Sequence, residues 1–187
     1  GASLLMSVLL RPPAASVPAS AVHLCTKAVA LAAVEACRPV TAPSGVAVRL
    51  KWPNDLIVDT ALGTRKLGGI LAESIVDGGS ISAVVVGLGL NVAWPTELPV
   101  ELADVAIALN HLPGAEQSPQ VAAREAVLQR LLRRLETLYA GLLEDGPEPL
   151  LDHYRTECAT LGQHVRVELI GSMVEGRASD IDGDGHL

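Results

Sequence analysis

The chain has 187 residues, enough for one full domain and a small second one. Nearly half of its residues are apolar and Phe is absent, so the core must consist mainly of Ala, Leu, Val and Ile. The net charge of −7 and the lack of a Lys/Arg run argue against binding to nucleic acid, and no apolar stretch approaches the ~20 residues of a membrane span.

The first residues predict a strand followed by a buried helix. Residues 4–10 are apolar and are followed by Pro12 and Pro13, which end a strand. Residues 16–37 carry small and apolar side chains at helical spacing, and Pro39 lies just beyond them. Residues 1–10 have neither a basic segment nor an initiator Met, so we expect no signal peptide and a fragment of a longer protein.

The centre of the chain predicts an antiparallel meander. Residues 46–52 alternate between apolar and polar, which is typical of a half-buried strand, and residues 56–58 continue this strand pattern after a proline turn. Two further strands are expected at residues 66–76 and 81–92, joined by Asp-Gly-Gly at 77–79, a hairpin signal.

The last third predicts two helices and the beginning of a small β unit. Residues 120–143 carry a leucine-rich stripe opposite Arg and Glu, and we interpret this stripe as core. A further helix is expected at residues 148–158, and Val165, Val167 and Leu169 alternate as in a strand.

The cysteines and acidic turns carry no chemistry of their own. Cys25, Cys37 and Cys158 are far apart and lack C-x-x-C spacing, so we expect reduced core thiols in a cytoplasmic protein. Residues 180–185 match the first half of a calcium loop, but the chain ends before the required Glu, and a hairpin turn is the better interpretation. No P-loop, G-x-S-x-G elbow or H-E-x-x-H motif is present.

Rare residues gather in the stretch RLKWPNDL at residues 49–56. Its centre predicts a turn that presents Asn54 and Asp55 at the end of a rigid strand, where they could bind phosphate, ribose or the water of a metal ion. Residue types alone favour a simpler interpretation, in which PND is a turn and Trp52 fills the core.

Lys66 is the second candidate for a functional residue. Because the chain has eleven Arg and only three Lys, a position that keeps Lys can require a compact ammonium group. Lys66 precedes Gly68 and Gly69, which remove side chains where a ligand could lie close. A solvent-exposed Lys before a glycine bulge is an equally good interpretation of this pattern.

The third candidate is GLGLNV at residues 87–92. It begins like a dinucleotide-binding fingerprint, but Val92 replaces the third Gly and no helix follows. What remains is a strand whose Gly87 and Gly89 admit a flat ligand and which ends at Asn91. A central strand weakened by glycine explains the pattern equally well.

In combination and in this order, KWPND at 51–55, RKLGGILAE at 65–73 and GLGLNV at 87–92 resemble the catalytic domain of the biotin protein ligases. The resemblance implies an α+β fold with a mixed, largely antiparallel sheet and packed helices, as in class II aminoacyl-tRNA synthetases. It also implies a division into a catalytic domain at 1–160 and the start of an SH3-like β domain at 161–187. The family's Gly/Arg-rich loop would precede Gly1, and without it we expect this fragment to be nearly inactive.

The resemblance further implies an enzyme that uses ATP and Mg²⁺ to convert biotin into biotinyl-5′-AMP. The biotinyl group then passes to one lysine of a biotin carboxyl carrier domain. Lys66 matches the catalytic lysine and also contacts biotin. The remaining matched positions are Gly69, Leu71, Gly87, Gly89 and Leu90 for biotin, and Asn54, Asp55 and Asn91 for ATP with its Mg²⁺. No residue is assigned as a direct metal ligand.

Three alternatives remain open. A lipoate or octanoate ligase shares the fold and an equivalent lysine, although KLGGIL and KWPND favour biotin. A small-molecule-binding regulator without catalytic activity could use the same scaffold. A purely structural module would leave the clustering of rare residues unexplained. The resemblance is compatible with a homodimer and does not identify the carrier.

Overall fold

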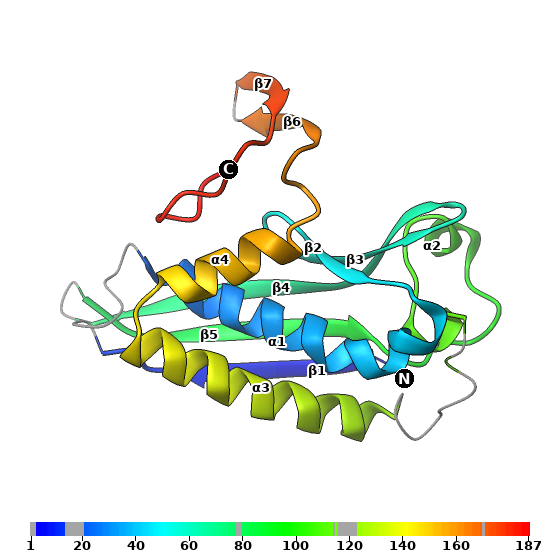
Figure 1. Ribbon diagram of the computed structural model, residues 1–187, viewed down its shortest axis with the longest axis horizontal. Coiled ribbons are helices and arrows are strands. Elements are labelled where there is room, and N and C mark those ends of the chain that lie inside the picture. The colour runs from blue at the N-terminus through cyan, green and yellow to red at the C-terminus, as the bar shows by residue number, and fades with distance from the viewer. Residues whose placement is uncertain (1–2, 14–20, 78–79, 114, 116–122, 170) are drawn as a thin grey trace.

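A five-stranded sheet organises the protein. The computed structural model describes residues 3–13, 21–77, 80–113, 115, 123–169 and 171–187. The strands lie in the order β1-β5-β4-β3-β2, and every neighbouring pair is antiparallel (Figure 1). Their bounds are β1 Ser3–Leu10, β2 Val48–Lys51, β3 Asp55–Thr60, β4 Gly63–Asp77 and β5 Ser80–Asn91. The predicted meander is therefore confirmed, and β1 extends it by pairing with β5.

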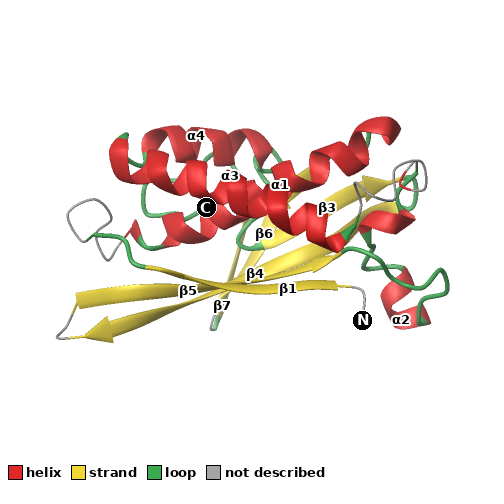
Figure 2. Ribbon diagram, turned by 90° about the horizontal axis from the view of Figure 1, so that it is seen from below, coloured by secondary structure: helices red, strands yellow, loops and turns green. Residues whose placement is uncertain are grey.

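Three long helices cover one face of this sheet, whereas its other face carries no described helix (Figure 2). They are α1 His23–Thr41, α3 Arg124–Glu144 and α4 Glu148–Glu157. The short helix α2 Val100–Ala103 and the 3-10 helices Ala42–Ser44 and Leu109–His111 lie in connecting segments. This two-layer arrangement confirms the expected α+β class.

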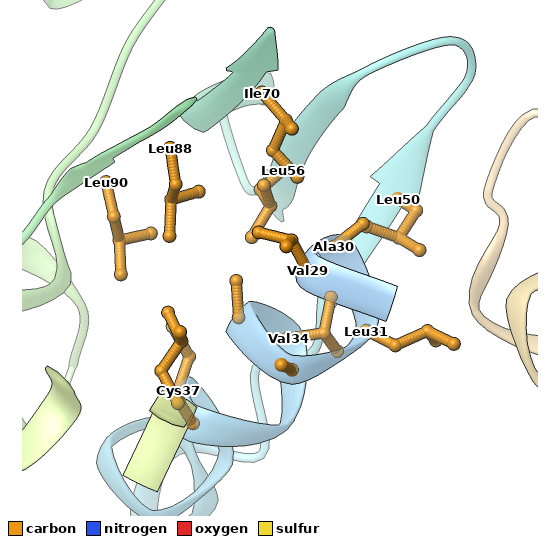
Figure 3. Packing of buried hydrophobic residues seen from close by; sticks show 14 of the residues in the cluster. Val29, Ala30, Leu31, Val34, Cys37, Leu50, Leu56, Ile70, Leu88 and Leu90 are labelled. Carbon is orange, nitrogen blue, oxygen red and sulfur yellow. The ribbon is translucent and has the colours of Figure 1, made fainter. Parts of the chain in front are cut away.

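The core lies between the sheet and α1. Side chains alternate along each strand, so Leu56 of β3, Ile70 of β4, and Leu88 and Leu90 of β5 all point toward the helices. Figure 3 shows these side chains facing Val29, Val34 and Cys37 of α1. Small residues along α1 allow it to be buried on several sides at once, because α3 and α4 pack against it as well.

Helix α1 continues past the expected stop. Pro39 lies inside the helix, which ends only at Thr41, so the prediction of an end before Pro39 is wrong. Proline lacks only its own N–H donor, and the following turn still forms because the Ala42 N–H donates to the Arg38 carbonyl. Residues 16–20 of the predicted helix lie outside the described residues.

The three cysteines are part of the core. Cys25, Cys37 and Cys158 are free and buried. Burial raises the pKa of the Cys25 thiol to about 11 and that of Cys37 to about 12, which makes both thiols poor nucleophiles.

None of the described helices combines the length and apolarity needed to cross a membrane.

The C-terminal residues form a separate two-stranded sheet and then return to the helices. Strands β6 His164–Leu169 and β7 Ser172–Arg177 pair as a hairpin. Residues after β7 fold back, so Ile181 is buried and its carbonyl accepts hydrogen bonds from Arg155 of α4. The division at residue 160 stays a prediction.

The acidic turn is not the hairpin that we expected at residues 180–185. No strand flanks it within the described residues, because β7 ends earlier, at Arg177. Asp182 closes this turn by accepting the N–H groups of Asp184 and His186 on its Oδ1. These backbone hydrogen bonds are the main reason why the pKa of Asp182 is lowered.

Leu131 and Leu132 of α3 provide a test of the core. Leu131 is 0% exposed, whereas Leu132 is 46% exposed, although both belonged to the predicted stripe. We expect Leu131→Ala to lower the free energy of unfolding by about 2–5 kcal/mol, because it leaves a cavity. Leu132→Ala should cost less than about 1 kcal/mol. Urea unfolding of both variants measures the difference, and equal losses would contradict this packing.

Candidate active site

The second and third motifs come together on the face of the sheet opposite the three long helices, which we call the open face. The β4–β5 register pairs Gly69 with Gly89 and Leu71 with Gly87. Because paired residues share a face, these four positions all lie opposite the helices. They line a hollow of about 560 Å³, a size typical of small-molecule sites. Its full lining is Leu5, Met6, Ser7, Asn54, Lys66, Gly69, Ile70, Leu71, Gly87, Leu88 and Gly89.

A β-bulge turns Lys66 toward this hollow. On β3, Leu56 pairs with Gly68 and Ile57 pairs with Lys66, so Leu67 of β4 has no partner on that strand. Leu67 points into the core, which leaves Lys66 on the open face. Without the extra residue, the alternation along β4 would direct Lys66 toward the helices, together with Ile70.

Lys66 pairs with Asp55 at the edge of the hollow. The Lys66 Nζ lies 2.5 Å from the Asp55 Oδ1, and half of the Lys66 side chain stays exposed. A Cβ on Gly69 would lie 3.2 Å from the Lys66 Nζ, so Gly69 gives the ammonium room to approach the strand. The ion pair therefore places one cation and one carboxylate beside the bare backbone of β4 at Gly69.

Asn54 connects the first motif to the same site. Its carbonyl accepts the Ile70 N–H at 2.9 Å, and its Nδ2 donates to the Ile70 carbonyl at 2.9 Å. These two bonds fix the turn between β2 and β3 against β4. Trp52 is half-buried, and its Nε1 donates to the Gly185 carbonyl. The turn interpretation of PND is thus confirmed, and the same turn brings Asn54 and Asp55 to Lys66.

Asn91 holds the backbone on the other side of Lys66. Its Nδ2 donates to the Ile107 carbonyl at 3.1 Å and, at 3.5 Å, to the Lys66 carbonyl. Lys66 also exchanges backbone hydrogen bonds with the segment 105–107, through Val105 and Ile107. The Nδ2 of Asn91 is thus engaged with backbone carbonyls, and Asn91 is not among the residues that line the hollow.

Leu90 does not join the other predicted residues. It is 0% exposed and points toward the helices, because it alternates with Gly89 and Asn91 along β5. Its side chain therefore does not line the hollow, and the assignment of Leu90 to biotin stays a prediction that only its backbone could fulfil. Leu71, in contrast, is 74% exposed and lines the hollow.

Sequence reasoning missed two contributors to the site. Leu5 and Ser7 of β1 pair with Gly89 and Gly87, and so border the hollow from a third strand. The segment 105–107 supports Lys66 although no element was predicted there. A strand was predicted at residues 4–10, but nothing in the sequence indicated that it lies next to β5.

Gly87 and Gly89 on the open face are not required by packing. A Cβ on Gly89 would meet only Leu5 Cδ2 at 3.6 Å, and a Cβ on Gly87 would meet nothing closer than 3.7 Å. Gly68 differs, because its Cβ would lie 2.6 Å from the Gly89 carbonyl oxygen. Glycine inside a strand weakens it. The absence of side chains at Gly87 and Gly89 therefore favours a bound ligand over a demand of the fold.

The candidate site offers one carboxylate to a metal ion. Among the residues that the structure describes, no three His, Cys, Asp or Glu side chains lie together in a metal-binding group. Asp55 is the acidic residue nearest to Lys66, and the Asn54 Oδ1 lies on the same turn. This donor set suits Mg²⁺, which keeps several waters and is commonly held by one or two carboxylates together with phosphate oxygens.

Comparison with known proteins identifies relatives along the entire chain. Residues 1–91 match the model of the biotin/lipoate A/B protein ligase family. The biotin–[acetyl-CoA-carboxylase] ligase of Mycobacterium tuberculosis is 35% identical over 187 residues, which are 100% of this chain and 63% of that protein. The bifunctional ligase/repressor BirA of Bacillus subtilis is 28% identical over 97% of this chain and 52% of its own length.

The fold also matches a solved structure. The biotin protein ligase from Aquifex aeolicus, in complex with biotin and ATP, has a TM-score of 0.74 and 23% identity. The match covers 98% of this chain and 69% of that chain. It shows that the two proteins share a fold. The chain thus spans between half and two thirds of the length of the curated relatives described above.

Two glycines test whether the open face is free of packing constraints. We expect Gly68→Ala to lower the free energy of unfolding by about 2 kcal/mol or more, because the new methyl group meets a backbone oxygen. Gly89→Ala should change it by less than about 1 kcal/mol. Urea unfolding of both variants gives the comparison. A large loss for Gly89→Ala would show that packing explains this glycine.

Proposed function

The chain belongs to the biotin/lipoate A/B protein ligase family, and on this premise we propose that it is the catalytic part of a biotin–protein ligase. In this proposal the protein joins biotin to ATP, releases pyrophosphate and forms biotinyl-5′-AMP. It then transfers the biotinyl group to one lysine of a biotin carboxyl carrier domain. The observation that carries the proposal is the position of the Lys66 ammonium, at the edge of a hollow lined by glycines and next to Asp55.

In the first step, a carboxylate oxygen of biotin attacks the α-phosphorus of ATP. The bond between this phosphorus and the bridging oxygen to the β-phosphate breaks, and pyrophosphate leaves. Two anions must approach each other, so their repulsion opposes the reaction. A fixed ammonium between them reduces this repulsion and stabilises the charge that develops on the phosphate oxygens. We assign this role to Lys66.

The hollow would hold the ring system of biotin. Gly69, Gly87 and Gly89 leave the strand backbones accessible to a flat ligand, and Leu71 and Leu5 offer apolar contacts beside them. The Ser7 hydroxyl lies on the same face and is available for a polar contact. Leu90 could contribute only backbone atoms. Apolar surface with a few polar groups is typical of sites for small ligands.

Asn54, Asp55 and Asn91 would serve the nucleotide. Asp55 and the Asn54 Oδ1 would hold Mg²⁺, which supplies positive charge to the phosphates when it is bound. Asp55 has a second role in the free protein, because its carboxylate restrains the Lys66 ammonium at 2.5 Å. The Asn91 Oδ1 would accept a hydrogen bond from the nucleotide while its Nδ2 keeps the backbone of Lys66 in place.

In the second step, the neutral amine of the carrier lysine attacks the acyl carbon of biotinyl-5′-AMP. The bond from this carbon to the phosphate oxygen breaks, AMP leaves with the bonding electrons, and the amine releases its proton. The carrier must therefore approach the open face, which bears the hollow.

Lys66→Arg tests the catalytic assignment. The variant keeps the positive charge, but the planar guanidinium is larger than the ammonium and cannot take the same place between two reactants. We expect the rate of biotin-dependent pyrophosphate release to fall about 100-fold or more, the usual effect of losing one stabilising donor. The reverse exchange at the neighbouring position, Arg65→Lys, serves as a matched control and should stay close to the wild-type rate. Wild-type turnover in Lys66→Arg would remove Lys66 from the mechanism.

Substrate choice separates the three remaining functions. We expect the protein, with ATP and Mg²⁺, to release pyrophosphate with biotin and not with lipoate or octanoate. Measuring pyrophosphate with each acid in turn gives the answer. Release with lipoate or octanoate alone would favour the lipoate ligase alternative, and biotin binding without pyrophosphate would favour a regulator.

A further inference from the structure

A second cavity lies at the N-terminal end of α1. It has a volume of about 280 Å³ and is bordered by α1, by the turn between β2 and β3, by α4 and by Gly185 near the C-terminus. His23, Lys27, Leu50, Trp52 and Tyr154 line it, and none of them borders the open-face hollow. The two spaces meet at Asn54, Ile70 and Leu71, which line both.

This cavity contains a buried ammonium group without a counter-ion. Lys27 is only 6% exposed. Its Nζ lies 2.9 Å from the His23 Nδ1 and 5.0 Å from the centre of the Tyr154 ring. Within the described part of the chain, no carboxylate lies within 4.0 Å of this Nζ. A buried charge that lacks a partner is unfavourable, and proteins normally avoid it.

His23 is a neutral partner and cannot supply the missing charge. Its Nε2 lies 3.1 Å from the Gly183 carbonyl, so Nε2 donates there and Nδ1 accepts from Lys27. Burial and the neighbouring Lys27 lower the pKa of His23, which keeps the ring neutral. One of the three ammonium protons is thus used, and the other two are available to a ligand in the cavity.

The remaining walls are apolar or neutral except at Asp55, whose carboxylate pairs with Lys66. Leu50, Trp52 and Tyr154 provide apolar and aromatic surface. Burial raises the pKa of the Tyr154 hydroxyl far above neutral pH, so it brings no negative charge. Gly185 closes one side, and an added Cβ there would lie 2.8 Å from the Lys27 Nζ. The C-terminal turn therefore lies against the ammonium, and its Asp182 offsets only part of the effect by which burial lowers the pKa of Lys27.

We propose that this cavity is a binding site for a small monocarboxylate with an apolar body. Lys27 would pair with the carboxylate, and the aromatic and aliphatic walls would cover the rest of the molecule. One cation calls for one negative charge, so a phosphate dianion would leave an excess of buried charge. The site is separate from Lys66, and the inference does not depend on the ligase reaction.

Benzoate is a suitable probe, and benzamide is its uncharged control of the same shape. We expect benzoate to bind the full chain at least about tenfold more tightly than benzamide at pH 7, measured by calorimetry, because only benzoate pairs with the ammonium. Lys27→Met keeps a long apolar side chain and removes the charge, so it should weaken benzoate binding by about tenfold or more. Lys51→Met removes the charge of a lysine that does not line the cavity, so it should leave this binding unchanged.

A second measurement requires no substitution at Lys27. Burial lowers the pKa of Lys27 to about 8, while His23, Tyr154, Cys158 and Asp182 are the titratable groups that surround it. A bound carboxylate favours the charged ammonium, so saturation with benzoate should raise this pKa. NMR of the Lys27 side chain reports the shift directly.

Three results would overturn the proposal. Benzoate and benzamide could bind equally, which would show that charge plays no part. Benzoate binding could be lost in Lys66→Met and kept in Lys27→Met, which would assign the ligand to the open-face hollow. Benzoate could also leave the pKa of Lys27 unchanged at saturation. Failure of biotin activation, in contrast, would leave all these measurements unaffected.

Discussion

The register between β4 and β5 is the constraint on which the site depends. It places Gly69 opposite Gly89 and Leu71 opposite Gly87, and thereby leaves a strip of bare backbone on the face without helices. A shift of one residue would move Leu88 and Leu90 to that face and turn the glycines toward α1. The burial of both leucines against α1 opposes this shift, so the packing of one face fixes the chemistry available on the other.

Lys66 is positioned almost entirely by backbone contacts. The bulge at Leu67 turns its side chain to the open face, and the segment 105–107 pairs with its backbone on the side away from β3. Asn91 adds a side-chain amide to the same arrangement. The proposed catalytic ammonium can be held precisely in this way although half of its side chain is exposed, because its Cα has little freedom.

The turn at residues 52–55 connects the two faces of the protein. Asn54 lines both spaces, and Asp55 lines the cavity beside α1 while its carboxylate pairs with Lys66 of the open-face hollow. Trp52 lines the same cavity as Lys27 and Tyr154 and donates a hydrogen bond to the Gly185 carbonyl. The same short segment thus borders the proposed catalytic site and the proposed carboxylate site. A ligand beside Trp52 could influence the position of Asp55, and this would offer a physical route between the two sites.

The sequence by itself determined the main strands and long helices and the three motifs, because alternation and helical spacing are local properties. It also indicated Lys66 through the scarcity of lysine in an arginine-rich chain. Tertiary structure decided what local pattern cannot express, namely which strands are neighbours and which side chains meet. Only pairing across the sheet brings Leu5 and Ser7 to the glycines and joins Lys66 to Asp55. The burial of Lys27 without an ion-pair partner is likewise a property of the assembled fold, because burial depends on contacts between residues far apart in the chain.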